Sequence, residues 1–462
     1  MKNTASPGSA RHLVCGFVSP AQTAEHGTLQ LVRGRGIHVW DKQGRRYIDG
    51  MSSLWNVAVG HGEPSIARAV QRQMCQLAYA PTLLGFSSRP AEELARRIVQ
   101  MAPRGLTRVL FTSGGSEANE SVIRLVRLYW RLRGKPDKYR IVALNHAYHG
   151  SSTGAASLTG LRHFHHHYEP LLDGTLRMVR PHCFRCELGR EFPQCGLACA
   201  DELEWIVQRE GADRIGALVA EPVQGVGGVI VPPEGYHARL REICDRYGIL
   251  LVYDEVITGF GRLGYPFGIQ RWKVVPDMIS FAKGVTSGYL PLGGVLLREE
   301  IYQAFVDAGP DFALHHGFTY SGHPAVCAAA LANLNLMRRR RLLSRARRLE
   351  RFFAEQLRRL QKHSIVGDVR SIGLMGAVEF VADRHTRQPF PAQWQVAARV
   401  RQACLQRGLI VRASGDVLAL CPPLVARRPD LERIVSLLDL AIQDVASQLS
   451  VRSVHPVRSL PS

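Results

Sequence analysis

From residue 107 onward, short apolar runs alternate with longer stretches of helical periodicity. The runs lie at residues 108–111, 140–143, 215–220, 249–253, 278–281 and 293–297. Short continuous apolar runs are typical of strands buried on both faces, and helical stretches between them favour parallel connections. The pattern therefore predicts a mainly parallel α/β sheet with helices on both faces.

The segments that flank this region predict a second, smaller unit. Strand-like runs lie at residues 37–40, 46–49, 375–381 and 418–420, and helical stretches lie near 391–407 and 429–448. Another long helical stretch follows residue 325. We expect residues 54–325 to form the large domain, with 1–53 and 326–462 supplying the N- and C-terminal parts of a smaller α+β domain.

Small and polar residues follow the predicted strands at their carboxyl ends, where open parallel sheets bind ligands. The run ending at Phe111 is followed by the segment TSGGSEAN (residues 112–119). Its small residues could hold a phosphate at a helix N-terminus, although Gly and Ser also begin ordinary helices. Tyr148 follows the run ending at residue 143. Its ring could stack on a planar cofactor or pack into the domain.

An acid and a lysine follow two further runs. Asp254 comes directly after residues 249–253, and a buried carboxylate needs a positive partner such as a protonated pyridine nitrogen. Lys283 follows residues 278–281. A half-buried lysine there is either an ion-pair partner or a nucleophilic amine whose pKa is lowered by its surroundings. Together with a phosphate loop and an aromatic ring, this combination is what pyridoxal 5′-phosphate (PLP) chemistry requires.

These segments resemble those of the class III aminotransferases of PLP fold type I, and the resemblance runs from about Gly34 to Ala446. It implies a large domain built on a mainly parallel, seven-stranded sheet, a smaller α+β domain, and PLP carried as a Schiff base on Lys283. The phosphate segment carries one glycine where the family has a polar residue. This departure shifts the expected phosphate contacts to Gly115 and Ser116.

The resemblance also implies roles for the residues around the cofactor. Tyr148 and Val256 would lie on opposite faces of the pyridine ring, and Asp254 would pair with its nitrogen. Glu221, in the segment EPVQG, matches a family glutamate near cofactor and substrate. Thr319, in GFTYSG, resembles the threonine that reaches the phosphate of the neighbouring subunit. We therefore expect a homodimer or a dimer of dimers.

Within the family, the chain most resembles the ω-aminotransferases that pair an amine or ω-amino acid with pyruvate. Trp55 resembles their substrate-pocket tryptophan, and Arg412 resembles the arginine that clamps a carboxylate through two parallel donors. The Trp-His-Pro-aromatic segment common in relatives is replaced here by residues 14–18, VCGFV. Another class III enzyme, such as a diaminopelargonate aminotransferase or an aminomutase, therefore stays an alternative.

The formal charge of +20 raises nucleic-acid binding as an alternative of a different class. No recognised binding motif accompanies this charge, and the densest basic stretch, residues 338–351, has the spacing of a solvated helix face. We therefore expect small-molecule amine and keto acid substrates, and neither nucleic acid nor membrane partners. No apolar run approaches the roughly 20 residues of a membrane helix. Residues 1–11 lack the apolar core of a secretory signal, which favours a cytoplasmic enzyme.

Four of the ten cysteines are grouped, at Cys183, Cys186, Cys195 and Cys199. Two pairs of thiols at this spacing could close a tetrahedral zinc site. The alternative is that they are free thiols of a loop in a reducing compartment. His182, Pro193 and Gly196 are typical of ordinary loop sequence, and nothing else in the chain demands a metal. We therefore expect free thiols and no metal.

Overall fold

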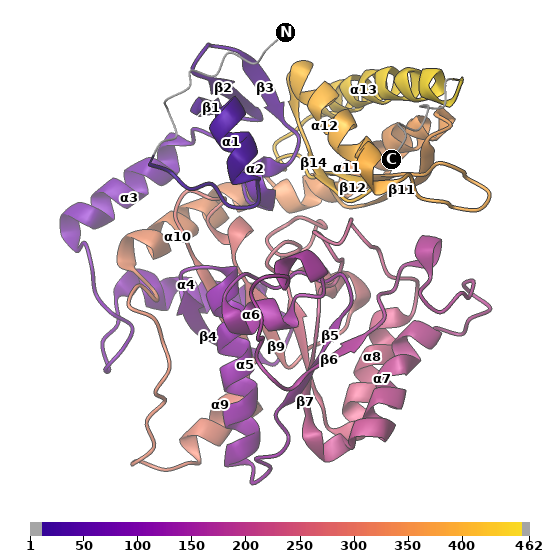
Figure 1. Ribbon diagram of the computed structural model, residues 1–462. Helices are drawn as coiled ribbons and strands as arrows, with labels where there is room; N and C mark the ends of the chain where they lie inside the picture. Colours follow the sequence, from indigo (N-terminus) through magenta and orange to yellow (C-terminus); the bar gives the residue numbers. More distant parts are fainter. Residues whose placement is uncertain (1–11, 455–462) are drawn as a thin grey trace.

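The computed structural model describes residues 12–454, and it arranges the strands in three sheets (Figure 1). The strands are β1 (Leu31–Arg35), β2 (His38–Asp41), β3 (Arg46–Asp49), β4 (Leu106–Thr112), β5 (Arg140–Leu144), β6 (Thr175–Met178), β7 (Ile215–Ala220), β8 (Leu250–Asp254), β9 (Met278–Phe281), β10 (Gly293–Arg298), β11 (Val366–Ile372), β12 (Met375–Phe380), β13 (Leu409–Ile410), β14 (Arg412–Ser414) and β15 (Val417–Leu420). Residues 1–11, on which part of the localisation prediction rests, lie outside the described residues.

Helices connect most of these strands. The α-helices are α1 (Pro20–His26), α2 (Ser52–Trp55), α3 (Pro64–Gln76), α4 (Arg89–Met101), α5 (Gly115–Leu132), α6 (Thr153–Leu158), α7 (Ala198–Glu210), α8 (Tyr236–Tyr247), α9 (Glu299–Val306), α10 (Pro324–Arg339), α11 (Leu342–Arg358), α12 (Val396–Gln406) and α13 (Arg428–Val454). Short 3₁₀ helices are η1 (Arg162–Phe164), η2 (Cys183–Arg185), η3 (Ala212–Arg214), η4 (Gly268–Trp272), η5 (Lys283–Val285), η6 (Arg359–Lys362) and η7 (Ala392–Trp394).

The large sheet has seven strands in the order β4-β10-β9-β8-β7-β5-β6. Neighbouring strands from β9 through β6 run parallel, and β10 alone pairs antiparallel with both β4 and β9. The predicted mainly parallel sheet is thus confirmed. Strand β6 was not among the predicted runs, because its sequence TLRM is short and only its last residue is buried.

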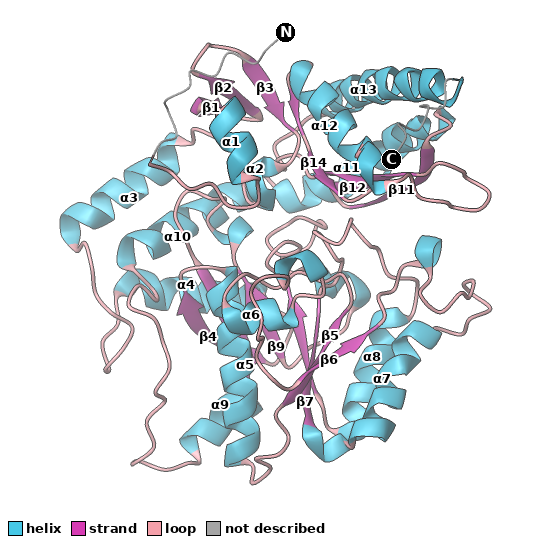
Figure 2. Cartoon of the chain, in the orientation of Figure 1, coloured by secondary structure: helices cyan, strands magenta, loops and turns pink. Residues whose placement is uncertain are grey.

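Helices cover both faces of the large sheet (Figure 2). Apolar side chains of α5, α6 and α9 pack with one set of strand residues, and those of α4, α7, α8 and α10 pack with the other set. Strand β7 is buried along its whole length, as expected for a central parallel strand. This packing fixes the positions of the carboxyl ends of the central strands. The polar residues predicted to form the site, such as Asp254 and Lys283, lie there.

Two smaller sheets lie beside the large one in Figure 1. In the first, with the order β1-β2-β3-β13, the C-terminal strand β13 pairs in parallel with the N-terminal strand β3. The second has the order β11-β12-β15-β14 and comes wholly from the C-terminal segment. An N-terminal and a C-terminal segment of the chain thus meet in one sheet. The domain boundaries after residues 53 and 325 stay a prediction.

Among residues 12–454, no helix is both long enough and apolar enough to cross a bilayer.

Candidate active site

A cavity of about 810 Å³ lies at the carboxyl ends of the central strands. Eight of the predicted site residues line it: Gly115, Ser116, Tyr148, Glu221, Asp254, Val256, Lys283 and Arg412. They come from six segments that are distant in sequence. Five of these lie at or just after the end of a strand of the large sheet, and the sixth is β14. The structure therefore gathers these predicted residues around one space, and it leaves out Trp55 and Thr319.

Lys283 stands two residues beyond β9, at the first position of η5. Its φ of 46° lies in the left-handed region, which a lysine adopts only when the surrounding structure imposes it. Burial lowers the pKa of its amine to about 8, while the carboxylates of Asp254 and Glu221 oppose that shift. The amine therefore loses its proton far more readily than an ordinary lysine amine does, as a nucleophile or general base requires.

Asp254 is the last residue of β8, and it is buried with 4% of its surface exposed. Its Oδ2 lies 2.7 Å from Asn119 Nδ2, which donates to it, and 2.8 Å from His149 Nδ1. Its Oδ1 accepts a hydrogen bond from the backbone N–H of Val256 at 3.0 Å. These contacts fix the carboxylate at the cavity wall. Asn119 and His149 had no predicted role.

Glu221 follows β7 and is also buried. Its carboxylate accepts hydrogen bonds from the backbone N–H groups of Tyr148 at 3.1 Å and Gly225 at 2.9 Å. Burial raises the pKa of Glu221 to about 7, with the neighbouring Asp254 acting in the same direction. Glu221 can therefore hold or release a proton near neutral pH, and it fixes the backbone that carries Tyr148.

The helix α5 begins at the cavity with two small residues, Gly115 and Ser116. Gly114 precedes the helix and offers no side chain to cap it, so the first backbone N–H groups are free to bind an anion. Gly150 completes this corner at a φ of 139°, and a Cβ there would lie 2.6 Å from Ser116 Oγ. The corner therefore admits a compact anionic group such as a phosphate.

Tyr148 and Val256 form part of the cavity wall, and both are half-buried. The Tyr148 ring packs against Phe164 with a centroid separation of 5.0 Å. Phe164 in turn packs against Phe17 of the N-terminal segment at 5.5 Å. The segment that replaces the family's usual N-terminal motif therefore helps to close the cavity.

Arg412 is the first residue of β14, and its half-buried guanidinium lines the same cavity as Lys283. It also lines an adjoining hollow of about 890 Å³ that contains Phe164 and Tyr168. Burial lowers the pKa of Arg412, and no acidic side chain of the described residues contributes to that pKa. A buried guanidinium without a carboxylate partner is suited to bind an anionic ligand.

Trp55 lies one layer behind the cavity wall. Its side chain is 2% exposed and packs in an apolar cluster with Met51, Val226 and Ile257, all of which line the cavity. The indole N–H has no hydrogen-bond partner among residues 12–454. The preceding Leu54 is 55% exposed and reaches the cavity instead. In this structure Trp55 supports the wall rather than forming its surface.

Thr319 lies on an exposed loop and does not line the cavity. Its carbonyl oxygen accepts a hydrogen bond from the Tyr79 hydroxyl at 2.7 Å. A single chain therefore does not bring Thr319 to its own site.

The cavity residues fit the cofactor that the sequence resemblance implies. The corner at Gly115 and Ser116 suits a phosphate, and Lys283 supplies an amine with a lowered pKa. Asp254 supplies a fixed carboxylate, and Tyr148 supplies an aromatic wall. The described residues thus offer one group for each functional part of PLP.

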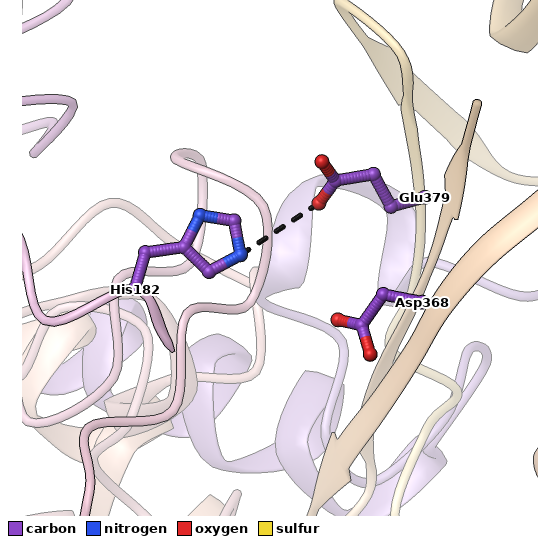
Figure 3. A group of neighbouring side chains, drawn as sticks. All are labelled: His182, Asp368 and Glu379. Carbon is purple, nitrogen blue, oxygen red and sulfur yellow. Dashed lines mark ion pairs between the residues drawn. The ribbon is translucent and has the colours of Figure 1, made fainter. Parts of the chain in front are cut away.

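A separate polar cluster contains three potential metal ligands, His182, Asp368 and Glu379. Figure 3 shows His182 directed at Glu379, with Asp368 beside it, and their potential ligand atoms lie within 4.8 Å of one another. Glu379 also pairs with Arg185 and with Arg370, and Arg370 lies 2.7 Å from Asp368 as well. The two guanidinium groups already balance the two carboxylates. We therefore interpret the cluster as an ion-pair network.

The sequence of the chain matches a known family model and curated relatives. Residues 20–442 match the model described as Aminotransferase class-III. The putrescine–pyruvate aminotransferase of Pseudomonas aeruginosa is 36% identical over 441 residues, which cover 95% of this chain and 96% of that protein. The adenosylmethionine-8-amino-7-oxononanoate aminotransferase of Nitratidesulfovibrio vulgaris is 41% identical over 404 residues, which cover 87% of this chain and 74% of that protein.

Solved structures give the same result. A thermostable (S)-enantioselective ω-transaminase from Thermomicrobium roseum superposes with a TM-score of 0.91 at 41% identity, covering 94% of this chain and 97% of that one. The ω-transaminase from Pseudomonas jessenii in complex with PMP gives a TM-score of 0.94 at 34% identity, covering 97% of this chain and 99% of that one.

Proposed function

The chain belongs to the class III aminotransferases, and we propose that within this family it transfers an amino group from an amine or ω-amino acid to a keto acid, with pyruvate as acceptor. It is a PLP-dependent enzyme with the PLP fold type I. The observation that carries the substrate proposal is the position of Arg412. Its guanidinium lines the Lys283 cavity without a carboxylate partner among the described residues, so it is available to an acidic substrate.

We assign the proton transfers to Lys283. When bound, PLP supplies an aldehyde that reacts with amines and a ring that accepts the electrons left by a departing proton. The Lys283 Nζ first acts as the nucleophile that holds the cofactor. When it is not bound to the cofactor, the Lys283 amine would take the proton from the substrate carbon and later return it, as general base and then acid.

The other groups position and tune the site. Asp254, held by Asn119 and His149, keeps a negative charge where a protonated ring nitrogen is needed. The α5 terminus binds the phosphate, and Tyr148 and Val256 enclose the ring. Arg412 then holds the acceptor's carboxylate, which fixes the keto carbon relative to Lys283.

Arg412→Ala should separate the two half-reactions. A desolvated charge-assisted pair contributes a few kcal/mol, so reaction of the amino form of the enzyme with pyruvate should slow by about a hundredfold or more. Reaction of the PLP form with a carboxylate-free amine should change much less. Stopped-flow absorbance would follow PLP loss with the amine and PLP recovery with pyruvate.

A matched control is available at the rim of the same cavity. Arg401, on α12, also lines the cavity but is exposed, so Arg401→Ala should leave the pyruvate step nearly unchanged. If Arg401→Ala slows that step and Arg412→Ala does not, the clamp is assigned to the wrong arginine. Equal slowing of both half-reactions in Arg412→Ala would remove the main support for a keto acid clamp.

A second candidate function is suggested by the names of two relatives. Both the Nitratidesulfovibrio vulgaris and the Geobacter sulfurreducens proteins are adenosylmethionine-8-amino-7-oxononanoate aminotransferases, at 41% and 37% identity. A panel of donors assayed with pyruvate, beside S-adenosylmethionine assayed with 8-amino-7-oxononanoate, would decide between the two. Faster turnover of the second pair would reject pyruvate as the main acceptor.

We also propose a homodimer in which Thr319 serves the partner's phosphate. Thr319 lies on an exposed loop, and the loop that carries Tyr79 packs against it. These two loops expose large apolar side chains: Tyr79 at 42%, Leu84 at 92%, Phe86 at 63% and Tyr320 at 64%. Apolar groups gathered on a surface mark an interface. A partner seated there would meet Thr319.

Subunit mixing tests this arrangement. Homodimers of Lys283→Ala chains and homodimers of Thr319→Ala chains should each be weakly active. In each of them, both active sites lack one native residue. Random exchange should restore about a quarter of native activity, since half of the dimers then hold one complete site. Thr319→Ser, which keeps the hydroxyl, is the control and should stay active. No recovery after verified exchange would contradict the shared site.

A further inference from the structure

The four grouped cysteines lie around one small cavity that the transaminase site does not use. Its volume is about 20 Å³, close to the space that a single water or ion occupies. Its lining includes all four thiols, from Cys183, Cys186, Cys195 and Cys199, together with apolar side chains such as Leu188 and Phe192. None of the four forms a disulfide. The fold thus collects two thiol pairs that are separated by a loop.

Each pair stands at a tight local turn. Cys183 opens η2 and Cys186 follows its last residue, while the N–H of Gly189 donates to the Cys186 carbonyl at 3.1 Å. On the other side, the N–H of Ala198 donates to the Cys195 carbonyl at 3.1 Å, and Cys199 lies in the first turn of α7. Short turns that carry paired cysteines hold thiols in the arrangement that structural zinc sites use.

Polar and charged side chains surround the same cavity. His182 lines it and is 6% exposed; its Nε2 lies 3.7 Å from Glu379, and neither ring nitrogen has a hydrogen-bond partner among the described residues. A neutral imidazole carries one ring N–H and can therefore donate one hydrogen bond. Arg180 and Arg190 also line the cavity. Such donors and positive charges are what a cluster of thiolates requires from its surroundings.

We propose that Cys183, Cys186, Cys195 and Cys199 bind one structural Zn²⁺ ion. On binding, each thiol loses its proton to solvent and each sulfur forms one bond to the metal, with no change in oxidation state. The resulting complex carries a charge of about −2, because four thiolates surround a divalent ion. The guanidinium groups of Arg190 and of Arg180, which also pairs with Glu187 at 3.2 Å, partly offset that charge, and the His182 N–H can donate to a thiolate sulfur.

The thiols reach their final positions only around the metal. In this structure the one set of potential ligand atoms within 4.8 Å of one another, among the described residues, is the His182, Asp368 and Glu379 cluster. The sulfur atoms must therefore turn inward from the cavity wall. All four cysteines already line one cavity, so rotations about their side-chain bonds with small loop adjustments can close the site.

The position of the cavity indicates what the ion does. The loop before Cys186 is tied to the C-terminal sheet, because Arg185 pairs with Glu379 of β12 and donates to the Arg387 carbonyl at 2.8 Å. Its other side is tied to the segment that follows β5 and leads to Tyr148, because Glu187 accepts a hydrogen bond from Asn145 at 2.8 Å. A zinc ion would fix this connection to the start of α7. The role is structural rather than catalytic.

Metal analysis of the holoenzyme tests the proposal directly. Protein produced in zinc-supplemented medium and purified with a thiol reductant should contain about one zinc per chain by mass spectrometry. The variant with Cys186→Ser and Cys199→Ser should lose this zinc. Cys75→Ser, which changes an exposed thiol on α3, is the matched control and should keep it. PLP content of the same samples, read by absorbance, reports independently whether each variant has folded.

Measurements on the unmodified chain cover the case in which the double variant does not fold. Stepwise blocking of thiols with an organomercurial should release zinc to a coloured chelator, and zinc removal should lower the thermal midpoint by several degrees. Replacement by Co²⁺ should give the strong visible bands of a tetrahedral thiolate complex. The proposal would be overturned if protein produced with zinc available contained no zinc while Cys183, Cys186, Cys195 and Cys199 all reacted as free thiols. A disulfide between any two of these four cysteines, found by mass spectrometry, would also overturn it. An unchanged thermal midpoint after zinc removal would overturn the structural role.

Discussion

Lys283→Ala is expected to lower turnover by at least about ten-thousandfold, the largest effect of any substitution considered for this chain. The side chain provides both the amine that holds PLP and the base that moves the proton, and alanine replaces neither. The variant should also lose covalently bound cofactor, while phosphate contacts at α5 retain some noncovalent PLP. Absorbance before and after borohydride reduction measures the covalent fraction, and steady-state assays measure the turnover.

Peptide mapping supplies the control for this assignment. Borohydride should fix the pyridoxyl group to the peptide that contains Lys283. The rival is Lys138, whose amine is 2% exposed and has a pKa lowered by burial. Lys138 instead donates to the carbonyls of Ala212 at 3.0 Å and Tyr247 at 3.4 Å, and it does not line the cavity. Label on Lys138, or normal turnover in Lys283→Ala, would reject the proposed nucleophile.

The sequence predicted the strands best where they are buried on both faces. Residues 215–220 and 278–281 match β7 and β9 in their bounds, because a continuous apolar run has few alternatives to a central strand. Strand β6 was missed because it lies at the sheet edge, pairs only with β5, and needs few apolar residues. The antiparallel direction of β10 was also not predictable from its own apolar run.

The site was predictable where chemistry depends on a position directly after a strand, as with Asp254 and Lys283. Asn119 and His149 gave no such signal, because their roles depend on contacts with Asp254 across 135 and 105 positions of the chain. The burial of Trp55 behind the cavity wall is likewise a matter of packing between segments. Only family resemblance pointed to Thr319, since its proposed partner is another chain.

Asp254→Asn should lower turnover by roughly a hundredfold to a thousandfold, which is the size of losses when one charge-stabilising group is removed from an enclosed site. The substitution keeps the shape of the side chain and removes its charge. The amide oxygen can still accept from the Val256 N–H, and the new NH₂ group can donate to His149 Nδ1. Without the Asp254 carboxylate, the negative charge that would favour a protonated ring nitrogen of PLP is lost. Cofactor content should therefore fall much less than turnover.

Glu255→Gln is the matched control, because Glu255 is the adjacent buried carboxylate and does not line the cavity. It accepts hydrogen bonds from Thr258 Oγ1 at 2.5 Å and from the backbone N–H of Ile269 at 2.7 Å. Its loss should reduce thermal stability and leave turnover per bound PLP nearly unchanged. If both variants lose turnover in proportion to stability, the Asp254 effect is structural. Near-normal turnover in Asp254→Asn would show that the ring does not depend on this charge, because the amide preserves every other feature of the side chain.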